Sequence, residues 1–447
     1  MMGVLERPVS PPVTLNSEQI ARLRGWLLDQ LSSDIAPSGP LAGDELRPRI
    51  AARLQQAYES AQVKLSPDVR EALLRELLDE LVGYGPIQSL LDDPTISEVM
   101  VNGPRRVFIE RGGKVEATQV HFEDDNHVLR VIDRIVSPLG RRVDYDSPLV
   151  DARLPDGSRV NAVVAPVALD GPSITIRKFA RKKPTVEDLI GYGSITPDMA
   201  EFLRACVIAR LNIVISGGTG SGKTTLLNVL SNFIPEADRI VSIEDSAELK
   251  LSQINLVRLE AKPPNVEGKN AVTIRELVRN ALRMRPERIV VGEVRGGEAL
   301  DMLQAMNTGH DGSLTTLHAN SPRDAISRME TLALMAGLDL PQQVVREQIA
   351  AAVDLIVQQA RLEDGSRKVT HITEVAGMEG NIVTLTDVFK FREEGRSPEG
   401  KVIGQMRPTG IRPLFGERLK AAGFDLKPEI FGASQSDILD PRNRRRR

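Results

Sequence analysis

A glycine-rich segment is the part of this sequence whose residue types are best suited to phosphate chemistry. It reads Gly217-Gly-Thr-Gly-Ser-Gly-Lys223-Thr224 and matches the spacing G-x-x-x-x-G-K-S/T in full. Its glycines let successive backbone N–H groups converge on phosphate oxygens, while the lysine ammonium reaches the β- and γ-phosphates and the threonine hydroxyl binds Mg²⁺. The segment predicts nucleotide binding by Gly217, Gly218, Thr219, Gly220, Ser221, Gly222, Lys223, Thr224 and Thr225.

The residues on both sides of this segment have the pattern that a phosphate-binding loop requires. Residues 211–216 form an apolar run that predicts a buried strand, and residues 224–233 predict the helix that follows. The N-terminus of that helix adds the positive end of its dipole to the site. A glycine-rich turn that matches by chance is the alternative, and the strand and helix at the right positions count against it.

Acidic side chains follow two further predicted strands. Glu244 follows the strand at 240–243, and Glu293 follows the strand at 289–292, where Gly292 stands at the position at which most P-loop enzymes have a magnesium-holding Asp. The carboxyl ends of parallel strands meet at one crevice, so both acids should lie near the loop. Transfer of a phosphoryl group to water needs a positioned nucleophile and neutralisation of charge on the γ-phosphate. We assign Glu244 mainly to the water and Glu293 mainly to Mg²⁺; the reverse assignment and a capping role at a strand end stay open.

A histidine ends another apolar strand, at residues 314–318. His318 follows two threonines, and this position indicates a sensor of the γ-phosphate that reports hydrolysis to the sheet. A structural histidine satisfied within the core is the alternative. For His310, between Gly309 and Asp311, a functional and a structural role are equally open.

Charge and composition exclude several other classes of protein. Lys and Arg number 58 against 61 Asp and Glu, and the net charge of −3 speaks against a globally basic nucleic-acid coat. The single cysteine, Cys206, cannot form an internal disulfide, which fits a reducing compartment. No apolar run approaches the roughly 18–20 residues of a membrane span, and the N-terminus has no signal-peptide core. We expect a cytoplasmic protein.

Composition and periodicity divide the chain into segments. At about 150 residues per domain, 447 residues predict two or three domains. Strands that alternate with helices after the linker predict a mostly parallel sheet covered on both faces, which is an α/β architecture. The expected segments are a disordered N-terminus (1–15), a helical module (16–82), an α+β domain with an antiparallel sheet (83–180), a linker (181–186), the α/β domain (187–430) and a disordered basic tail (431–447).

Smaller signals place elements before the linker. Ser66 and Pro67 predict the start of a helix, because Ser is a common N-cap and Pro is favoured at the first helical position. A first helix carries the apolar stripe Ile20, Leu23, Leu27 and Leu31. Turns at Asn102-Gly103, Gly112-Gly113 and Pro155-Asp156-Gly157 predict strand pairs. A helix at about 124–137 should place Val128, Leu129, Ile132 and Ile135 on one side.

Four stretches of the chain are typical of one family. The sequence resembles the type II/IV secretion ATPase superfamily and, within it, the tight-adherence (Tad, or Cpa) pilus motor ATPases. The resemblance covers roughly residues 65–425. One departure is Glu287, where the family usually has Asp. The stretches are Ile96-Ser-Glu-Val-Met-Val-Asn-Gly-Pro104, Asp151-Ala-Arg-Leu-Pro-Asp-Gly-Ser-Arg-Val-Asn161, Asn280-Ala-Leu-Arg-Met-Arg-Pro286 and Met306-Asn-Thr-Gly-His-Asp-Gly-Ser-Leu-Thr-Thr-Leu-His-Ala-Asn-Ser-Pro322.

This resemblance implies an architecture and an assembly. It implies a PAS-like N-terminal domain joined to a RecA-like ATPase domain, a homo-hexameric ring, and ATP bound between the two domains. By resemblance, Arg159 and Arg177 reach over the phosphates when the domains close, and a planar guanidinium suits that task. An exposed strand arginine without this role is the alternative for each. Weaker candidates for the same task are Arg153, Arg279, Arg283 and Arg285.

The resemblance also implies a function. We expect a Mg²⁺-dependent ATPase, with ATP and Mg²⁺ as cofactors, that drives assembly and possible retraction of a Tad/Flp-type type IV pilus. Its partners would be an inner-membrane platform protein and, indirectly, the pilin, with peripheral membrane contact at the inner membrane and no nucleic acid. One alternative is a type IV secretion ATPase that powers substrate or DNA transfer. Another is a nucleotide-gated scaffold without hydrolysis, against which the intact Glu244, Glu293 and Lys223 argue.

Overall fold

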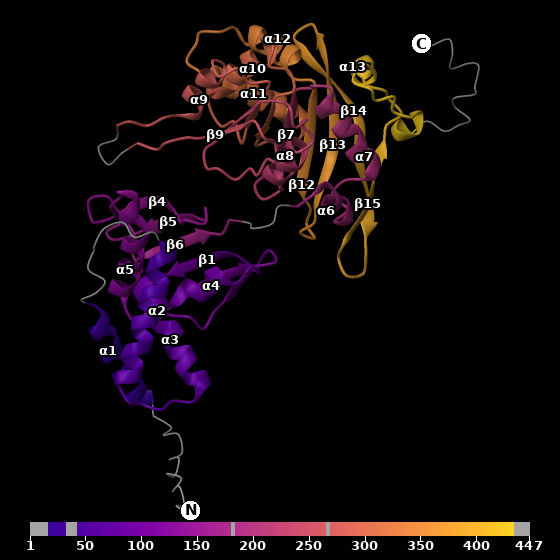
Figure 1. Cartoon of the computed structure of the whole chain (residues 1–447). Helices are drawn as coiled ribbons and strands as arrows, with labels where there is room; N and C mark the ends of the chain where they lie inside the picture. Colours follow the sequence, from indigo (N-terminus) through magenta and orange to yellow (C-terminus); the bar gives the residue numbers. More distant parts are fainter. Residues whose placement is uncertain (1–16, 33–42, 180–183, 265–268, 433–447) are drawn as a thin grey trace, which may run out of the picture. The chain divides into compact units, whose positions relative to one another are not determined.

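The computed structural model describes residues 17–32, 43–179, 184–264 and 269–432 (Figure 1). Contacts between Cα atoms divide the chain into two compact units, which we call unit 1 (Met1–Arg181) and unit 2 (Lys182–Arg447), and each is described by itself. The expected disordered N-terminus at 1–15, linker residues 181–183 and tail residues 433–447 lie outside the described residues.

Unit 1 begins with three helices that share a leucine-rich core. Leu23, Leu27 and Leu31 of the first helix are buried there, and Ile20 packs at its edge, so the predicted stripe is confirmed. Ser66 has the extended backbone of an N-cap, but its side chain makes no capping hydrogen bond. The helices of this module are α1 (Ser17–Ser32), α2 (Gly43–Ser60) and α3 (Pro67–Val82), followed by η1 (Gly85–Ile87) and α4 (Gln88–Asp92).

An antiparallel six-stranded sheet completes unit 1. Its strand order is β3-β2-β1-β6-β5-β4, and α5 (Asp125–Val136) packs with its buried face. Of the four apolar residues predicted on one side of this helix, Val128, Ile132 and Ile135 are buried, whereas Leu129 is 38% exposed. Leu129 follows Val128 directly, and a helix turns by about 100° per residue, which carries it away from that face. The strands are β1 (Ile96–Asn102), β2 (Val107–Arg111), β3 (Lys114–Ala117), β4 (Leu149–Arg153), β5 (Arg159–Val163) and β6 (Ser173–Arg177), with η2 (Ser137–Leu139) after α5.

Unit 2 is built on a nine-stranded mixed sheet of order β15-β14-β13-β12-β7-β11-β10-β8-β9. The strands from β12 to β9 in that order run parallel, whereas β13, β14 and β15 extend the sheet by antiparallel pairing. The predicted α/β class is confirmed. The strands are β7 (Ile213–Gly217), β8 (Ile240–Glu244), β9 (Leu256–Glu260), β10 (Arg288–Val291), β11 (Leu314–Leu317), β12 (Leu355–Arg361), β13 (Arg367–Glu379), β14 (Ile382–Arg396) and β15 (Val402–Pro408).

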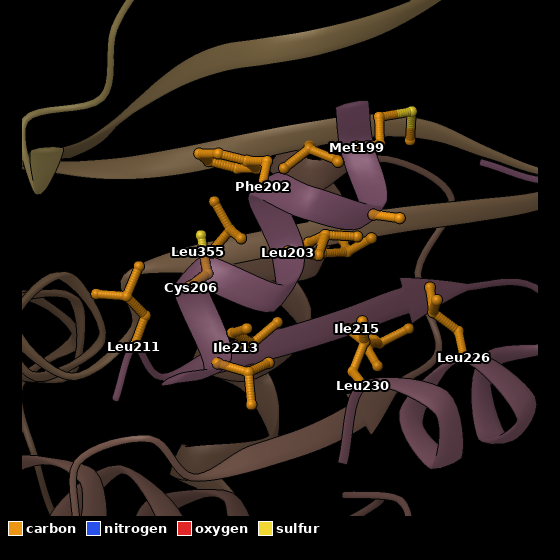
Figure 2. Packing of buried hydrophobic residues seen from close by; sticks show 14 of the residues in the cluster. Met199, Phe202, Leu203, Cys206, Leu211, Ile213, Ile215, Leu226, Leu230 and Leu355 are labelled. Atoms are coloured by element: carbon orange, nitrogen blue, oxygen red, sulfur yellow. The ribbon is translucent and has the colours of Figure 1, made fainter. Parts of the chain in front are cut away.

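Helices cover both faces of this sheet, because side chains that alternate along a strand enter two separate cores. Ile213 and Ile215 of β7 join the core that contains α7 and α8, including the buried Cys206 (Figure 2), whereas Val214 joins the core of α9 to α12. No helix within the described residues has the length and apolar character needed to cross a bilayer. The helices are α6 (Val186–Gly191), α7 (Pro197–Ile208), α8 (Lys223–Ser231), α9 (Ile274–Ala281), α10 (Glu298–Asn307), α11 (Pro322–Leu334), α12 (Gln342–Ala352), α13 (Gly416–Ala421) and η3 (Pro428–Phe431).

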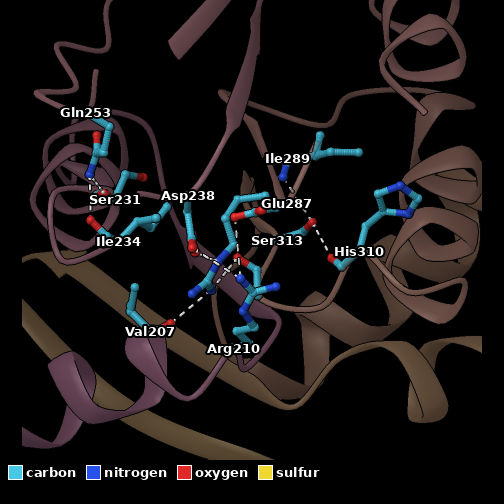
Figure 3. Close-up of polar contacts among 12 residues, drawn as sticks. Val207, Arg210, Ser231, Ile234, Asp238, Gln253, Glu287, Ile289, His310 and Ser313 are labelled. Atoms are coloured by element: carbon cyan, nitrogen blue, oxygen red, sulfur yellow. Dashed lines mark hydrogen bonds and ion pairs between the residues drawn. The ribbon is translucent and has the colours of Figure 1, made fainter. Parts of the chain in front are cut away.

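A buried ion pair lies at the amino ends of the parallel strands. Arg288 is fully buried, and its Nε donates to Asp238 Oδ2 at 2.8 Å, while Nη1 donates to the Val207 carbonyl at 2.9 Å (Figure 3). Burial alone would raise the pKa of Asp238, but the Arg288 guanidinium outweighs this effect and lowers it. His310 lies beside this network, because its carbonyl accepts from Ser313 Oγ at the amino end of β11. His310 therefore lies at the amino ends of the parallel strands, whereas the glycine-rich loop follows the carboxyl end of β7.

Candidate functional site

The glycine-rich loop joins β7 to α8, as its sequence predicted. Gly217 ends the buried strand, and Lys223 begins the helix, with Thr224 and Thr225 in the first helical turn. Between them, Gly218, Thr219 and Gly220 form the turn, and Ser221 Oγ donates to the Gly218 carbonyl at 2.9 Å. The loop therefore wraps around the N-terminus of α8, where backbone N–H groups and the helix dipole favour an anion.

Two of the loop glycines are required by their surroundings. A Cβ at Gly217 would overlap the backbone carbonyl oxygen of Gln359 on β12. Gly222 has φ +97°, and a Cβ there would lie 3.2 Å from the Gln359 Nε2 atom and 3.3 Å from the Arg367 Cδ atom. Strands β12 and β13 therefore fix the back of the loop, and side chains at these two positions would displace it.

Lys223, His318 and Glu293 converge beside the loop from three different elements. Lys223 Nζ lies 3.0 Å from the Gly217 carbonyl, 3.1 Å from the Gly218 carbonyl and 3.3 Å from His318 Nε2. Burial lowers the pKa of Lys223, and the Glu293 carboxylate opposes this shift. Burial and the Lys223 charge lower the pKa of His318, so a neutral imidazole that accepts from Lys223 through Nε2 fits the site.

Glu293 presents two oxygens in different settings. Its Oε2 accepts from Arg295 Nη2 at 2.8 Å. Its Oε1 is buried 2.8 Å from His318 Nε2 and has no hydrogen-bond partner among the described residues. A carboxylate oxygen in this position beside Lys223 would suit Mg²⁺ or one of its water ligands, with the Thr224 hydroxyl as a second ligand.

A metal ion at this place would also need oxygens from a bound nucleotide. Among the described residues, no group of three or more His, Cys, Asp and Glu side chains could hold a metal ion. Mg²⁺ commonly takes only one or two protein ligands and completes its shell with phosphates and water. The two protein oxygens of Thr224 and Glu293 fit that pattern.

Glu244 lies next to Gly292, and this contact accounts for a residue without a side chain at position 292. A Cβ at Gly292 would lie 3.1 Å from Glu244 Cγ, so an Asp at this position would crowd the buried glutamate. Glu244 Oε2 accepts from the backbone N–H groups of Glu248 at 2.7 Å and Leu249 at 3.0 Å. Burial raises the pKa of Glu244 in spite of these two hydrogen bonds. Glu244 Oε2 is thus engaged by the backbone, and a role of Glu244 in activating water stays a prediction.

A family model for "Type II/IV secretion system protein" matches residues 80–393, which is well over half of the chain. The chain belongs to this family. The superfamily level of the resemblance is therefore confirmed, whereas the Tad subtype stays a prediction.

Similar proteins carry names from conjugation and secretion. A putative conjugal transfer protein of Mycobacterium tuberculosis (strain CDC 1551 / Oshkosh) is 40% identical over 321 residues, covering 70% of this chain and 91% of that protein. Conjugal transfer protein TrbB of Rhizobium radiobacter is 37% identical over 313 residues, covering 69% of this chain and 92% of that protein. The crystal structure of the VirB11 ATPase from the Brucella suis type IV secretion system, in complex with sulphate, is 33% identical and covers 65% of this chain and 92% of that chain, with a TM-score of 0.36.

The arginines that the family resemblance singled out in unit 1 lie in one row. Arg159 stands directly opposite Arg177 on one side and Arg153 on the other, and Glu98 faces Arg177. Residues directly opposite in antiparallel strands share a face. The structure therefore brings Arg153, Arg159 and Arg177 together, and their action on a nucleotide stays a prediction.

The weaker arginine candidates lie in unit 2 and have different settings. Arg279 Nε donates to Asp301 Oδ1 at 2.7 Å, so Arg279 is an ion-pair partner on α9. Arg283 and Arg285 are exposed after the end of that helix.

Sequence reasoning missed three arginines that lie at or near the loop. Arg295 pairs with Glu293, and its Nη1 lies 3.5 Å from Asp245 Oδ2. Arg367 Nε donates to the Gly220 carbonyl at 2.9 Å, and the guanidinium of Arg361 lies near the same glycine. The signal for the last two was the apolar run at 355–357 followed by a turn at Asp364-Gly365, which predicts a hairpin.

Proposed function

We propose that this chain is a Mg²⁺-dependent ATPase that powers substrate transfer in a type IV secretion or conjugal transfer system. The observation that carries the enzymatic part is the convergence of Lys223, His318 and Glu293 beside the loop. The names of the relatives support the transfer system, and the matched regions cover about nine tenths of each of these relatives. A homo-hexameric ring that contacts the inner membrane from the cytoplasm is part of the proposal.

The residues of the loop divide the work of hydrolysis. Backbone N–H groups of the loop and the Lys223 ammonium hold the β- and γ-phosphates. Bound Mg²⁺ would neutralise phosphate charge, with Thr224 and Glu293 as its protein ligands. Either Glu293 or Glu244 orients the attacking water, and a neutral His318 senses the γ-phosphate through Lys223 and Glu293.

Loss of the lysine charge tests the enzymatic part. Lys223→Ala should abolish phosphate release from ATP, because the main cation on the β- and γ-phosphates is lost. The matched control is Lys420→Ala, since Lys420 is exposed on α13. In that helix Arg418 contacts Asp354 and Arg210, which precede the starts of β12 and β7, whereas the loop follows the end of β7. A pure, folded Lys223→Ala protein that releases phosphate at the wild-type rate would overturn the proposal.

A Tad pilus motor is the second candidate, because residues 96–104 and 306–322 are typical of those ATPases. Deletion of the gene in the organism that carries it separates the two functions. A secretion motor should lose DNA or protein transfer and keep its pili, whereas a pilus motor should lose surface pili. Complementation with wild-type and Lys223→Ala protein ties either loss to ATP hydrolysis.

A further inference from the structure

Strands β12 and β13 meet the loop on the side away from Glu293 and His318. In the sheet, β7 lies between β11 and β12, so the two sides of the loop are served by different strands. His318 follows β11 and Glu293 follows β10 on one side, while Arg361 ends β12 on the other. The loop therefore has a second flank, and the catalytic candidates do not occupy it.

Two arginines stand side by side on this second flank. Arg361 and Arg367 are directly opposite each other in the β12–β13 pair. Like charges in this cross-strand position are destabilising unless another group compensates them. The Arg367 side chain is held by its bond to the Gly220 carbonyl, whereas the Arg361 side chain makes no hydrogen bond or ion pair with any described residue.

The acids of the adjoining turn do not supply this compensation. Glu363 pairs with Arg396 Nη2 at 2.6 Å. Asp364 accepts from Ser366 Oγ at 2.6 Å and from the Val402 N–H at 2.9 Å. Both carboxylates are therefore engaged away from Arg361, and the positive flank lacks an anion among the described residues.

The position of Arg361 relative to the loop suggests which anion it meets. Its Nη1 lies 3.9 Å from the point where a Cβ on Gly220 would stand, and its side chain is exposed and long enough to swing. The transferred γ-phosphate must lie beside Lys223, Glu293 and His318 on the other flank. A phosphate of the nucleotide on the β12 side of the loop would therefore be one that is not transferred and that remains in ADP.

We propose that Arg361 binds a non-transferred phosphate of the nucleotide, and that this contact holds ADP as firmly as ATP. The inference rests on the proposed function, because it assigns a further residue to the same nucleotide. Arg367 braces the loop from behind through Gly220, and Arg361 reaches the ligand. A guanidinium suits the task because it stays charged and forms two parallel hydrogen bonds to phosphate oxygens.

The test is a comparison of nucleotide affinities in the full-length protein. Titration calorimetry with ADP and Mg²⁺ should show at least about tenfold weaker binding by Arg361→Gln, because even one charge-assisted hydrogen bond accounts for such a loss. ATP binding, measured in a Glu293→Gln background that slows hydrolysis, should weaken by the same factor. Arg361→Lys keeps the charge but loses the planar guanidinium, so its nucleotide affinities should lie between those of the wild type and of Arg361→Gln. The matched control is Arg412→Gln. Arg412 is exposed, and two residues later the Leu414 N–H donates to Glu374 on β13 rather than to the loop.

Each outcome decides the proposal. ADP affinity of Arg361→Gln within twofold of wild type would overturn it, and a loss confined to ATP would place Arg361 at the γ-phosphate instead. A wild-type protein that binds ADP but releases no phosphate from ATP would defeat the proposed ATPase, while the comparison of ADP affinities would still decide the role of Arg361. A wild-type protein that binds neither nucleotide would defeat both.

Discussion

At the scale of single residues, the two oxygens of Glu293 have different tasks. Arg295 binds Oε2 and fixes the direction of the carboxylate, while Oε1 lies 2.8 Å from His318 Nε2 and has no hydrogen-bond donor among the described residues. A buried acceptor without a partner costs free energy, and such cost is often found where a ligand completes the site. Glu293 is therefore the carboxylate whose charge should matter most for hydrolysis.

Glu293→Gln should bind ATP and hydrolyse it about 10²–10⁴-fold more slowly, the range for a positioned acid or base. Loop amides and Lys223 still hold the nucleotide, while the charge and the basic oxygen are lost. Steady-state phosphate release beside ATP affinity measures the two effects separately. Asp245→Asn is the matched comparison, because it removes a carboxylate 3.5 Å from the same Arg295 and should cost much less. Turnover by Glu293→Gln at the wild-type rate would move the essential carboxylate to Glu244.

The residues of this site differ in how far sequence could predict them. Lys223 follows from a dense local motif, and Glu293 and His318 follow from the rule that parallel strands end at one crevice. Neither signal predicts Arg295 or Arg361. The contact of Arg295 with Glu293 depends on side-chain direction, and Arg361 lies near the loop through a strand more than 130 residues later in the chain. The contact between Glu244 and Gly292 depends on register across two strands, which no single-sequence pattern fixes.

At the scale of elements, the loop is shaped by a strand far from it in sequence. The Gln359 carbonyl of β12 fills the space in which a Cβ at Gly217 would lie. Around Gly218, by contrast, no other atom lies within 4 Å of such a Cβ, and its φ is not in the left-handed region. Two adjacent glycines of one motif therefore serve different needs.

Gly217→Ala should lower the free energy of unfolding by about 1–3 kcal/mol, the usual cost of forcing extra atoms into a packed region. Gly218→Ala should change it by less than about 0.5 kcal/mol, as for an uncrowded surface position. Urea unfolding of the two variants measures both values. Equal losses in the two proteins would show that β12 does not press on the loop.

Sequence patterns predict the central strands of the unit 2 sheet better than the antiparallel strands at one end of it. Strands β7, β8, β10 and β11 are short apolar runs, and the sequence predicts them. The sequence does not predict strands β13 to β15, because they carry exposed charged residues on one face and their apolar alternation is broken by irregular register. Turn signals at Asp364-Gly365 and Gly380-Asn381 were present in the sequence and could have placed two of these hairpins.

At the scale of the whole molecule, hydrolysis should depend on both units. Unit 1 presents Arg153, Arg159 and Arg177 in one row on a face of its sheet, while Val160 and Ile176 point into the core on the other face. Three neighbouring guanidinium groups in one row suit contact with the oxygens of a phosphate. Unit 2 by itself holds the loop, the lysine and the carboxylates. From the family resemblance, we expect unit 2 to supply ground-state binding and the arginines of unit 1 to supply charge in the transition state.

Arg177→Ala should therefore lower turnover about 10²-fold, the loss typical of one group that stabilises developing charge, while ATP affinity falls by less than tenfold. Binding survives because the loop and Lys223 are untouched. The matched control is Arg130→Ala, an exposed arginine on α5, which packs against the opposite face of the same sheet. ATP affinity and turnover are measured on the same preparation of each variant. A fall in affinity as large as the fall in rate would assign Arg177 to ordinary nucleotide binding. Equal rates for Arg177→Ala and Arg130→Ala would separate the arginine row from catalysis, and unit 1 would then act in assembly or substrate contact instead.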